Sequence, residues 1–319
     1  MQGFNLFVHR TNIVYVMLLL LAGSSFLLFK KHRQDDTCLK PKSIVAFLNI
    51  GQGDAIYIQS SDGSNMLVDT GPKDGGLIDQ IQKVTGCPIK RIDKLLLTHP
   101  DADHIGEASR LIHKGVVGEV LHNGFLDVDQ KDESPTENQL EALPFDRQRI
   151  QTGDHFDLGM YTVDILFPDE NMYLATSTLS TLDKNKSKKL DDNQFSVVLK
   201  ITAASSTSFL LTGDAPAKVE EFLVKKFCPV KSFKPGVQRQ DCVLNADILK
   251  LGHHGSKTSS SALFLQTVSP TEVVVSASKN NTYGHPHKEV MNRIYEQRRK
   301  KPLWIRETFR EGNIVYTFP

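Results

Sequence analysis

Short apolar runs and mixed stretches alternate along most of the chain. Runs rich in β-branched residues and bounded by glycine or aspartate predict strands at residues 44–50, 55–59, 66–69, 94–98, 116–122, 161–167, 195–201, 208–211, 246–251, 272–276, 303–306 and 314–318. Helices are predicted at residues 78–84, 105–113, 218–227, 261–268 and 288–299. Because these elements alternate without a fixed repeat or a second linker, residues 43–319 are expected to form one layered α/β domain.

The most hydrophobic segment is residues 13–29, an apolar run without a charged residue that Lys30, Lys31 and Arg33 follow. A helix of that length rises about 25 Å, close to the minimum that spans a bilayer. We therefore predict an N-terminal hydrophobic helix within residues 1–34 that anchors the chain in a membrane, and a linker at residues 35–42. A cleaved signal peptide, which would give a secreted protein, and a soluble helix are the alternatives.

Two signals disagree about the side of the membrane on which the domain lies. Basic residues gather after the apolar segment, which favours the cytoplasm. An even number of cysteines permits disulfides outside the cell, and Cys228 and Cys242 bracket a loop with proline and glycine that predicts a stapled hairpin. Four ordinary thiols, with Cys38 and Cys87 included, are the alternative. The cysteines favour an extracytoplasmic domain, and the orientation stays open.

Composition excludes several classes of protein. With 39% hydrophobic and 24% charged residues, the chain is neither disordered, collagen-like nor a polytopic membrane protein. Residues 1–34 carry four basic and no acidic residues, so residues 35–319 hold 34 basic against 37 acidic residues, a net charge of −3. A domain that grips a nucleic-acid backbone is usually more basic. A local basic strip is either a polyanion contact or a solvated helix face: Lys288, Arg293, Arg298, Arg299, Lys300 and Lys301.

The strongest chemical signal follows the strand predicted at residues 94–98. There the chain places four candidate metal ligands close together: His99, Asp101, Asp103 and His104. A loop at the end of a strand presents such side chains from a rigid base, and imidazole with carboxylate suits zinc, manganese or iron. The alternative is an aspartate cap on the next helix, but a cap would not require two histidines.

Later strands end in residues of the same kind. Asp214 follows one of them, where it either bridges two metals or forms a Gly–Asp turn. His253 and His254 follow another. Because neighbouring side chains diverge, one is expected to bind metal and the other to orient it or to contact substrate. Tyr283 and His285 lie near a turn, where a role at the rim of the site and an ordinary turn are both open.

Six segments in order resemble those of the metallo-β-lactamase superfamily and, more narrowly, the C-terminal metallo-β-lactamase-like domain of the ComEC family of competence proteins for DNA internalisation. They are LNIGQGDA (48–55), LVDTGP (67–72), LLLTHPDADHIG (95–106), LLTGDA (210–215), LKLGHHGSKTSSS (249–261) and NNTYGHPH (280–287). The resemblance covers residues 43–318. It implies a four-layer αβ/βα sandwich with two divalent metal ions, Zn²⁺ or Mn²⁺, at the edge between its sheets.

The resemblance also implies roles for individual residues. One metal would be held by His99 and Asp101, and the other by Asp103, His104 and His253, with Asp214 between the two. Asp101 stands where the wider superfamily has histidine, and a third histidine for the first metal has no clear equivalent. From the chemistry of such a site, we expect Asp103 or Asp101 to take the proton of the attacking water. We expect His254, Lys257 or His285 to stabilise the developing oxyanion. Around the metals or against the substrate we expect Asp54, Asp69, Asn193, Ser256 and Tyr283.

These observations lead to one expected function and two alternatives. We expect a metal-dependent hydrolase that uses a metal-activated water, most specifically a phosphodiesterase or nuclease acting on DNA. The first alternative is a hydrolase of small esters or cell-envelope phosphodiesters. The second is a non-catalytic binding protein with a degenerate site. No nucleotide cofactor is expected. With one apolar segment, the chain carries no multi-pass channel of its own, so a separate DNA-uptake channel protein is an expected partner, beside DNA and the membrane.

Overall fold

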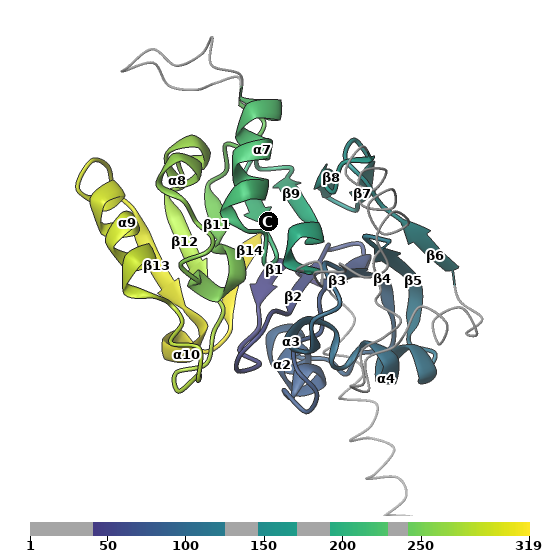
Figure 1. Cartoon of the computed structure of the whole chain (residues 1–319). Helices are drawn as coiled ribbons and strands as arrows, with labels where there is room; N and C mark the ends of the chain where they lie inside the picture. The colour runs from purple at the N-terminus through teal and green to yellow at the C-terminus, as the bar shows by residue number, and fades with distance from the viewer. Residues whose placement is uncertain (1–40, 125–145, 171–191, 229–241) are drawn as a thin grey trace, which may run out of the picture. The chain divides into compact units, whose positions relative to one another are not determined.

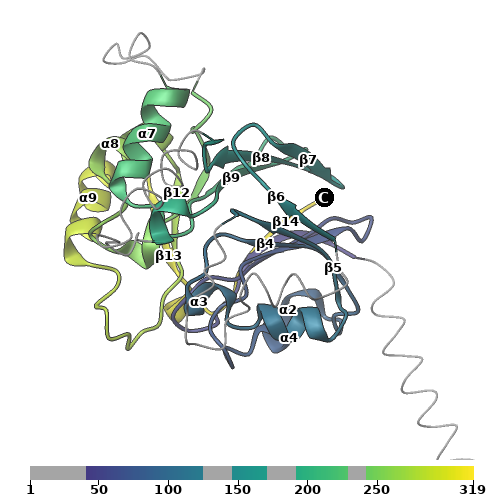
Figure 2. The same cartoon turned by 45° about the vertical axis from the view of Figure 1, so that its right-hand side comes forward.

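The computed structural model describes residues 41–124, 146–170, 192–228 and 242–319, which form two mixed β-sheets of seven strands each (Figures 1 and 2). The first sheet has the order β14 (Ile314–Phe318), β1 (Ser43–Phe47), β2 (Ile56–Gln59), β3 (Asn65–Val68), β4 (Ile92–Leu97), β5 (Val117–His122) and β6 (Asp146–Arg149). The second has the order β13 (Trp304–Glu307), β12 (Glu272–Val275), β11 (Ile248–Lys250), β10 (Ser208–Leu211), β9 (Val198–Ala203), β8 (Tyr161–Phe167) and β7 (His155–Leu158).

Helices cover the outer face of each sheet, as Figure 2 shows. The first sheet carries α2 (Leu77–Thr85) and α4 (Ala108–His113), and the second carries α7 (Ala217–Phe227), α8 (Ala262–Val268) and α9 (Lys288–Arg298). Three separate clusters of buried apolar side chains match this stacking: one under the helices of each sheet and one between the sheets. The predicted four-layer αβ/βα sandwich is therefore confirmed for the described residues.

Both sheets contain a run of parallel strands that places loops at one edge. In the first sheet β3, β4, β5 and β6 are parallel. In the second, β10, β11, β12 and β13 are parallel. Because ligand sites of such sheets lie beyond the carboxyl ends of the strands, the residues that follow β3, β4, β10 and β11 are brought to the same region.

Several predicted elements have different limits in the structure. Strands β6 and β7 were not predicted, because they are short polar strands at the open edges of the two sheets. The helix predicted at residues 105–113 is divided into α3 (Ala102–Ile105) and α4. Gly106 lies at the division, where a Cβ atom would come within 2.3 Å of the backbone nitrogen of Lys73. Residues 192–195 form a 3-10 turn, η1 (Asp192–Phe195), so the following strand starts later than predicted.

The predicted anchor at residues 13–29 and the predicted linker up to residue 40 lie outside the described residues. Residues 171–191, which precede η1, lie outside them as well. Within residues 41–124, 146–170, 192–228 and 242–319, no helix combines the length and apolar character needed to cross a bilayer. The predicted pairing of Cys228 with Cys242 is confirmed, with Cα atoms 5.0 Å apart. Cys87 is disulfide-bonded as well.

Candidate metal centre

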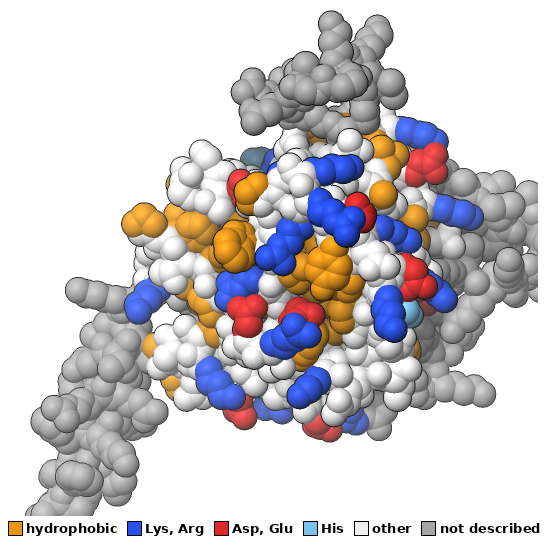
Figure 3. All heavy atoms as spheres, turned by 90° about the vertical axis from the view of Figure 1, so that its left-hand side faces the viewer, with side chains coloured by type: hydrophobic (Ala, Val, Ile, Leu, Met, Phe, Trp, Pro, Cys, Tyr) orange, Lys and Arg blue, Asp and Glu red, His pale blue; other side chains and the backbone are white. Residues whose placement is uncertain are grey.

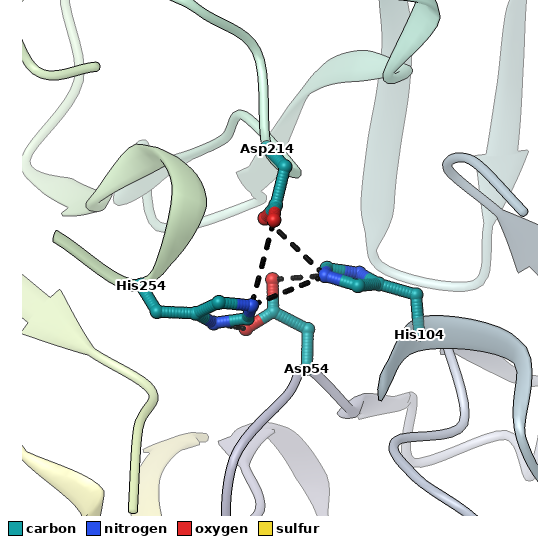
Figure 4. A group of neighbouring side chains, drawn as sticks. All are labelled: Asp54, His104, Asp214 and His254. Carbon is teal, nitrogen blue, oxygen red and sulfur yellow. Dashed lines mark hydrogen bonds and ion pairs between the residues drawn. The ribbon is translucent and has the colours of Figure 1, made fainter. Parts of the chain in front are cut away.

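The predicted ligands come together at the edge where the two sheets meet. Asp69 follows β3, and the 98–105 loop with α3 follows β4. From the second sheet, Asp214 follows β10, and the 3-10 turn η3 (Gly252–Gly255) follows β11. Figure 4 shows four of the side chains, Asp54, His104, Asp214 and His254, directed at one another. Their ligand atoms all lie within 4.8 Å of one another, and all four residues are buried.

One group of ligand atoms surrounds His254 Nε2. This atom lies 3.2 Å from Asp103 Oδ2, 3.5 Å from Asp214 Oδ2 and 3.3 Å from His104 Nε2. His104 Nε2 is also 3.2 Å from Asp214 Oδ1. Atoms bound at about 2.1 Å to a tetrahedral zinc ion lie about 3.4 Å apart. The spacing of these two nitrogens and two carboxylates therefore fits a single divalent cation at their centre.

A second group of ligand atoms shares Asp214 Oδ2 with the first. His99 Nε2 is 3.5 Å from Asp101 Oδ2 and 3.9 Å from Asp214 Oδ2. His253 Nε2 is 3.5 Å from the same Asp214 oxygen. His99 Nε2 is a buried atom without a hydrogen-bond partner among the described residues. Because an unpartnered buried polar atom is costly, this orphaned nitrogen also fits a cation that would bind here.

All four histidines are held so that Nε2 faces the centre. His104 Nδ1 lies 2.7 Å from Asp69 Oδ2, and His254 Nδ1 lies 2.9 Å from the backbone carbonyl oxygen of Ser276. A carboxylate and a carbonyl only accept hydrogen bonds, so in both rings Nδ1 carries the proton. His99 and His253 place Nδ1 3.0 and 3.4 Å from threonine hydroxyls. Such outer contacts orient metal-binding imidazoles.

The backbone of η3 directs the side chains of the adjacent residues His253 and His254 to different ligand atoms. His253 and His254 both have left-handed backbones, with φ of 50° and 53°. This conformation is unfavourable for residues other than glycine and tends to persist at functional sites. It directs His254 into the group with Asp103 and His104, whereas His253 contacts Asp214 Oδ2, the oxygen that His99 also faces. This arrangement differs from the one that the resemblance implies, in which His253 joins Asp103 and His104 and His254 contacts the substrate.

The charges of the centre depend on one another. Burial alone raises the pKa of Asp103 and of Asp214, but hydrogen bonds and charges from the imidazoles outweigh it and hold both pKa values below the ordinary range. Burial alone lowers the pKa of His254, but Asp214 and Asp54 raise it to about 9. The carboxylates thus stay ionised only because positive charge lies next to them, which is the role that a bound cation would fill.

Lys250 belongs to the centre although it is not among the residues predicted from the sequence. This lysine is fully buried in β11, and its ammonium forms an ion pair with Asp54. Its Nζ atom also donates to the backbone carbonyl of Gly213 at 3.2 Å. The available signal was a lysine in the middle of the apolar run Leu249–Leu251, because a charged residue at a core position needs a buried partner.

Other predicted residues lie around the rim. His285 is nearly buried, with its ring 5.4 Å from that of His253, and burial together with neighbouring imidazoles lowers its pKa to about 4. The exposed ring of Tyr283 stacks on His285 at 5.6 Å. Ser256 accepts a hydrogen bond from Thr258, inside the loop that follows η3. Lys257 is exposed, and its backbone N–H donates to His287.

Asn193 lies in η1, close in sequence to Ser196, whose hydroxyl accepts the backbone N–H of Asp214 at 3.1 Å. Asp69 accepts the backbone N–H and the hydroxyl of Thr98 at 2.8 and 2.7 Å, in addition to its contact with His104. Asp69 therefore ties the end of β3 to the loop after β4. Asp69 thus supports the loop that carries His99 and His104, and the carbonyl of Asn193 accepts the backbone N–H of Ser196 at 3.2 Å.

Comparisons with known proteins agree with this fold and site. A family model described as the metallo-beta-lactamase superfamily matches residues 48–189. Over 298 residues the chain is 29% identical to ComE operon protein 3 of Bacillus subtilis, covering 88% of this chain and 34% of that protein. It is 29% identical over 253 residues to competence protein ComA of Neisseria gonorrhoeae, covering 79% of this chain and 30% of that protein. The chain spans about a third of the length of these relatives.

Solved structures show the same architecture. CmlA, a diiron β-hydroxylase from Streptomyces venezuelae, has a TM-score of 0.52 at 13% identity, with 87% of this chain and 54% of that chain covered. At that identity the similarity concerns the fold alone. Taken with the family match and the curated relatives, it confirms that the chain resembles the metallo-β-lactamase superfamily and, within it, the competence proteins.

Proposed function

We propose that this protein is a metal-dependent hydrolase that cleaves phosphodiester bonds in DNA. The observation that carries the proposal is the pair of ligand groups that share Asp214 at the edge between the two sheets. A non-catalytic binding protein would not need this set of buried histidines and carboxylates with every Nε2 directed at one centre. The substrate is inferred from further features of the rim and from the relatives.

Two divalent cations fit the two groups. We assign Asp103, His104, Asp214 and His254 to one cation, and His99, Asp101, Asp214 and His253 to the other. The mixture of imidazole and carboxylate is compatible with both Zn²⁺ and Mn²⁺. Held by these residues, a pair of cations would supply an activated water as nucleophile and would stabilise charge on the oxygens of the substrate.

The chain itself then positions the substrate and moves protons. Asp103 and Asp101 are the carboxylates of the centre that reach solvent, with 31% and 36% of their side chains exposed, against 2% for Asp214. Water and substrate therefore enter on their side, where Asp103 can accept a proton. His285 is neutral at pH 7 because of its lowered pKa, so with Lys257 it can donate to an oxygen that gains negative charge.

Two observations support DNA as the substrate. The ring of Tyr283 is 64% exposed and stacked on His285 beside the centre, which is the arrangement of a side chain that stacks on a nucleobase. The names of two relatives also refer to processes that act on DNA: a competence protein, and recombination protein 2 of Haemophilus influenzae, which is 28% identical over 80% of this chain.

The disulfide between Cys228 and Cys242 supports a domain in an oxidising, extracytoplasmic compartment. There, held at the membrane by residues 13–29, it could act beside a separate uptake channel.

The test uses the full chain in detergent with Mn²⁺ or Zn²⁺ and with single- and double-stranded DNA. We expect cleavage that Asp103→Ala abolishes and that Asp79→Ala, an exposed change on α2, leaves intact. Metal content is measured on the same samples. If the wild-type chain binds the cation and cleaves neither form of DNA, the nuclease proposal is wrong.

A hydrolase of small esters or cell-envelope phosphodiesters is the second candidate, and the surface charge favours it. In the basic strip, Arg293 donates to the carbonyl oxygens of Ser259 and Ser260, and Lys301 donates to Ser269, so these cations serve the fold. Figure 3 shows Lys and Arg spread among acidic and hydrophobic side chains on the side of α9 and β13. Activity on long DNA that falls steeply with salt would favour the nuclease, whereas salt-independent cleavage of short esters would favour this candidate.

A further inference from the structure

The buried pair of Lys250 and Asp54 links the two halves of the domain behind the metal centre. Lys250 lies in β11 of the second sheet. Asp54 lies in the turn between β1 and β2 of the first sheet. Both side chains are at most 1% exposed, and the Lys250 ammonium also lies 3.9 Å from Asp214 Oδ1. The Lys250 ammonium thus contacts two carboxylates: Asp214, which both ligand groups share, and Asp54, which comes from the opposite sheet.

The turn that carries Asp54 is fixed against the loop of the ligands. The backbone N–H of Asp54 donates to the carbonyl oxygen of Asp103 at 3.2 Å. Gly53 packs so closely there that a Cβ atom would lie 2.1 Å from the same oxygen, and its φ of 130° is one that other residues rarely adopt. Asp54 cannot move away from the centre without moving Asp103.

Asp54 nevertheless faces the back of the imidazoles. Its carboxylate oxygens lie 3.9 Å from His104 Nδ1 and 3.5 Å from His254 Nδ1, whereas both rings present Nε2 to the other ligands. The carboxylate therefore adds negative potential to the centre from the Nδ1 side of both rings, and the paired Lys250 ammonium offsets that potential.

We propose that Lys250 is an internal counter-ion that lowers the affinity of the centre for divalent cations. It neutralises Asp54 and holds the Gly213–Asp214 turn from behind. Removing the ammonium while keeping the carboxylate leaves an extra buried negative charge next to the ligands. That charge attracts a divalent cation more strongly in the low-dielectric interior, so losing a buried contact is expected to tighten metal binding.

This sign separates the proposal from a purely structural role. A lysine that only holds two loops together would, once removed, loosen the ligands and weaken binding. The opposite change, Asp54→Asn, leaves Lys250 uncompensated and should weaken binding through repulsion of the cation. Removing both charges together restores the original balance, so the double variant should bind as the wild type does.

The test rests on the proposed metal binding and uses no activity measurement. The full chain in detergent is stripped with a chelator and titrated at pH 8 with Mn²⁺, with free Mn²⁺ followed by electron paramagnetic resonance. We expect Lys250→Met to lower the Kd about tenfold or more and Asp54→Asn to raise it about tenfold or more. The double variant should return within about threefold of the wild type.

The variants remain informative if one of them is unstable. An unpaired buried carboxylate destabilises a fold, so Lys250→Met could fail to give folded protein. In that case the Kd of Asp54→Asn for Mn²⁺ is compared with the Kd of the double variant. A return of the Kd toward the wild-type value when Lys250 is also replaced is expected only if Lys250 acts as a counter-ion. Weaker binding in Lys250→Met, or no recovery in the double variant, would overturn the role of Lys250. A wild-type chain that binds no Mn²⁺ or Zn²⁺ would overturn the proposed function and this role with it.

Discussion

Replacing Asp69 with asparagine tests how the outer contacts prepare the metal centre. Asp69 is fully buried and accepts three hydrogen bonds, from the backbone and hydroxyl of Thr98 and from Nδ1 of His104. In Asp69→Asn, one carboxylate oxygen becomes an NH₂ group, which cannot accept. If the amide oxygen keeps the backbone N–H of Thr98, the NH₂ group faces His104 Nδ1.

Two donors then meet unless the imidazole changes its tautomer. The alternative tautomer carries its proton on Nε2, the atom that faces Asp214 and the proposed cation, and a protonated nitrogen cannot bind metal. Loss of such outer partners typically lowers metal affinity 10- to 100-fold, which corresponds to about 1.4–2.7 kcal/mol. We expect a rise of that size in the Kd for Mn²⁺ or Zn²⁺.

The assay is a metal titration of the chelator-treated chain, with thermal unfolding measured on the same samples. The matched control is Asp62→Asn, which changes an exposed carboxylate that accepts hydrogen bonds from Ser64 in a turn. We expect this control to bind metal as the wild type does. Wild-type affinity in Asp69→Asn would refute the argument, because His104 would then not depend on Asp69 for its tautomer.

Three further predictions concern stability. Serine at both Cys228 and Cys242 should lower the free energy of unfolding by about 3 kcal/mol in chemical denaturation, since the disulfide closes a loop with a sequence separation of 14; an unchanged value would argue against an entropic role. His122 is buried beside two arginines, and burial, together with their charges, lowers its pKa from 6.5 to about 4. Its contribution is therefore complete above pH 6.5 and is lost as the pH falls toward 4, at a cost of about 3 kcal/mol, so His122→Gln should flatten the dependence of unfolding free energy on pH in this window. Gly53→Ala should prevent metal binding or folding, because its Cβ would clash with a backbone oxygen at 2.1 Å, whereas Gly51→Ala, also at positive φ but with nothing within 4 Å, should cost about 1 kcal/mol by thermal unfolding.

The sequence predicted the fold best where strands are apolar and buried. The run that ends at Leu97 is such a strand, and the ligands that follow it could be recognised from their residue types and spacing. Strands β6 and β7 escaped prediction because edge strands bury little, so their polar sequences carry no periodic signal. The helix after residue 105 was predicted as one element because the close approach of Lys73 to Gly106 is a tertiary contact.

The arrangement of the site was less accessible from the sequence. Which of His253 and His254 meets which carboxylate depends on two consecutive left-handed residues, and dihedral angles of this kind are not encoded in residue types other than glycine. Lys250 pairs with a residue in a distant turn, so only its unusual place in an apolar strand pointed to a buried partner. Asp54 could be placed near the site by its motif, but its position behind the imidazoles could not.

Strand β1 lies early in the described chain and pairs with β14 at its end, so the first sheet can be completed only after β14 has been synthesised. Ile44 lies opposite Thr317 and Phe47 lies opposite Ile314, so the edge of β1 that faces away from β2 is covered only when β14, the last strand of the described residues, has been synthesised. The ligands are divided in the same way, since Asp103 and His104 are synthesised long before Asp214 and His254. A cation held by side chains of both sheets, as proposed above, could therefore gain its full set of ligands only once the chain has been synthesised as far as His254.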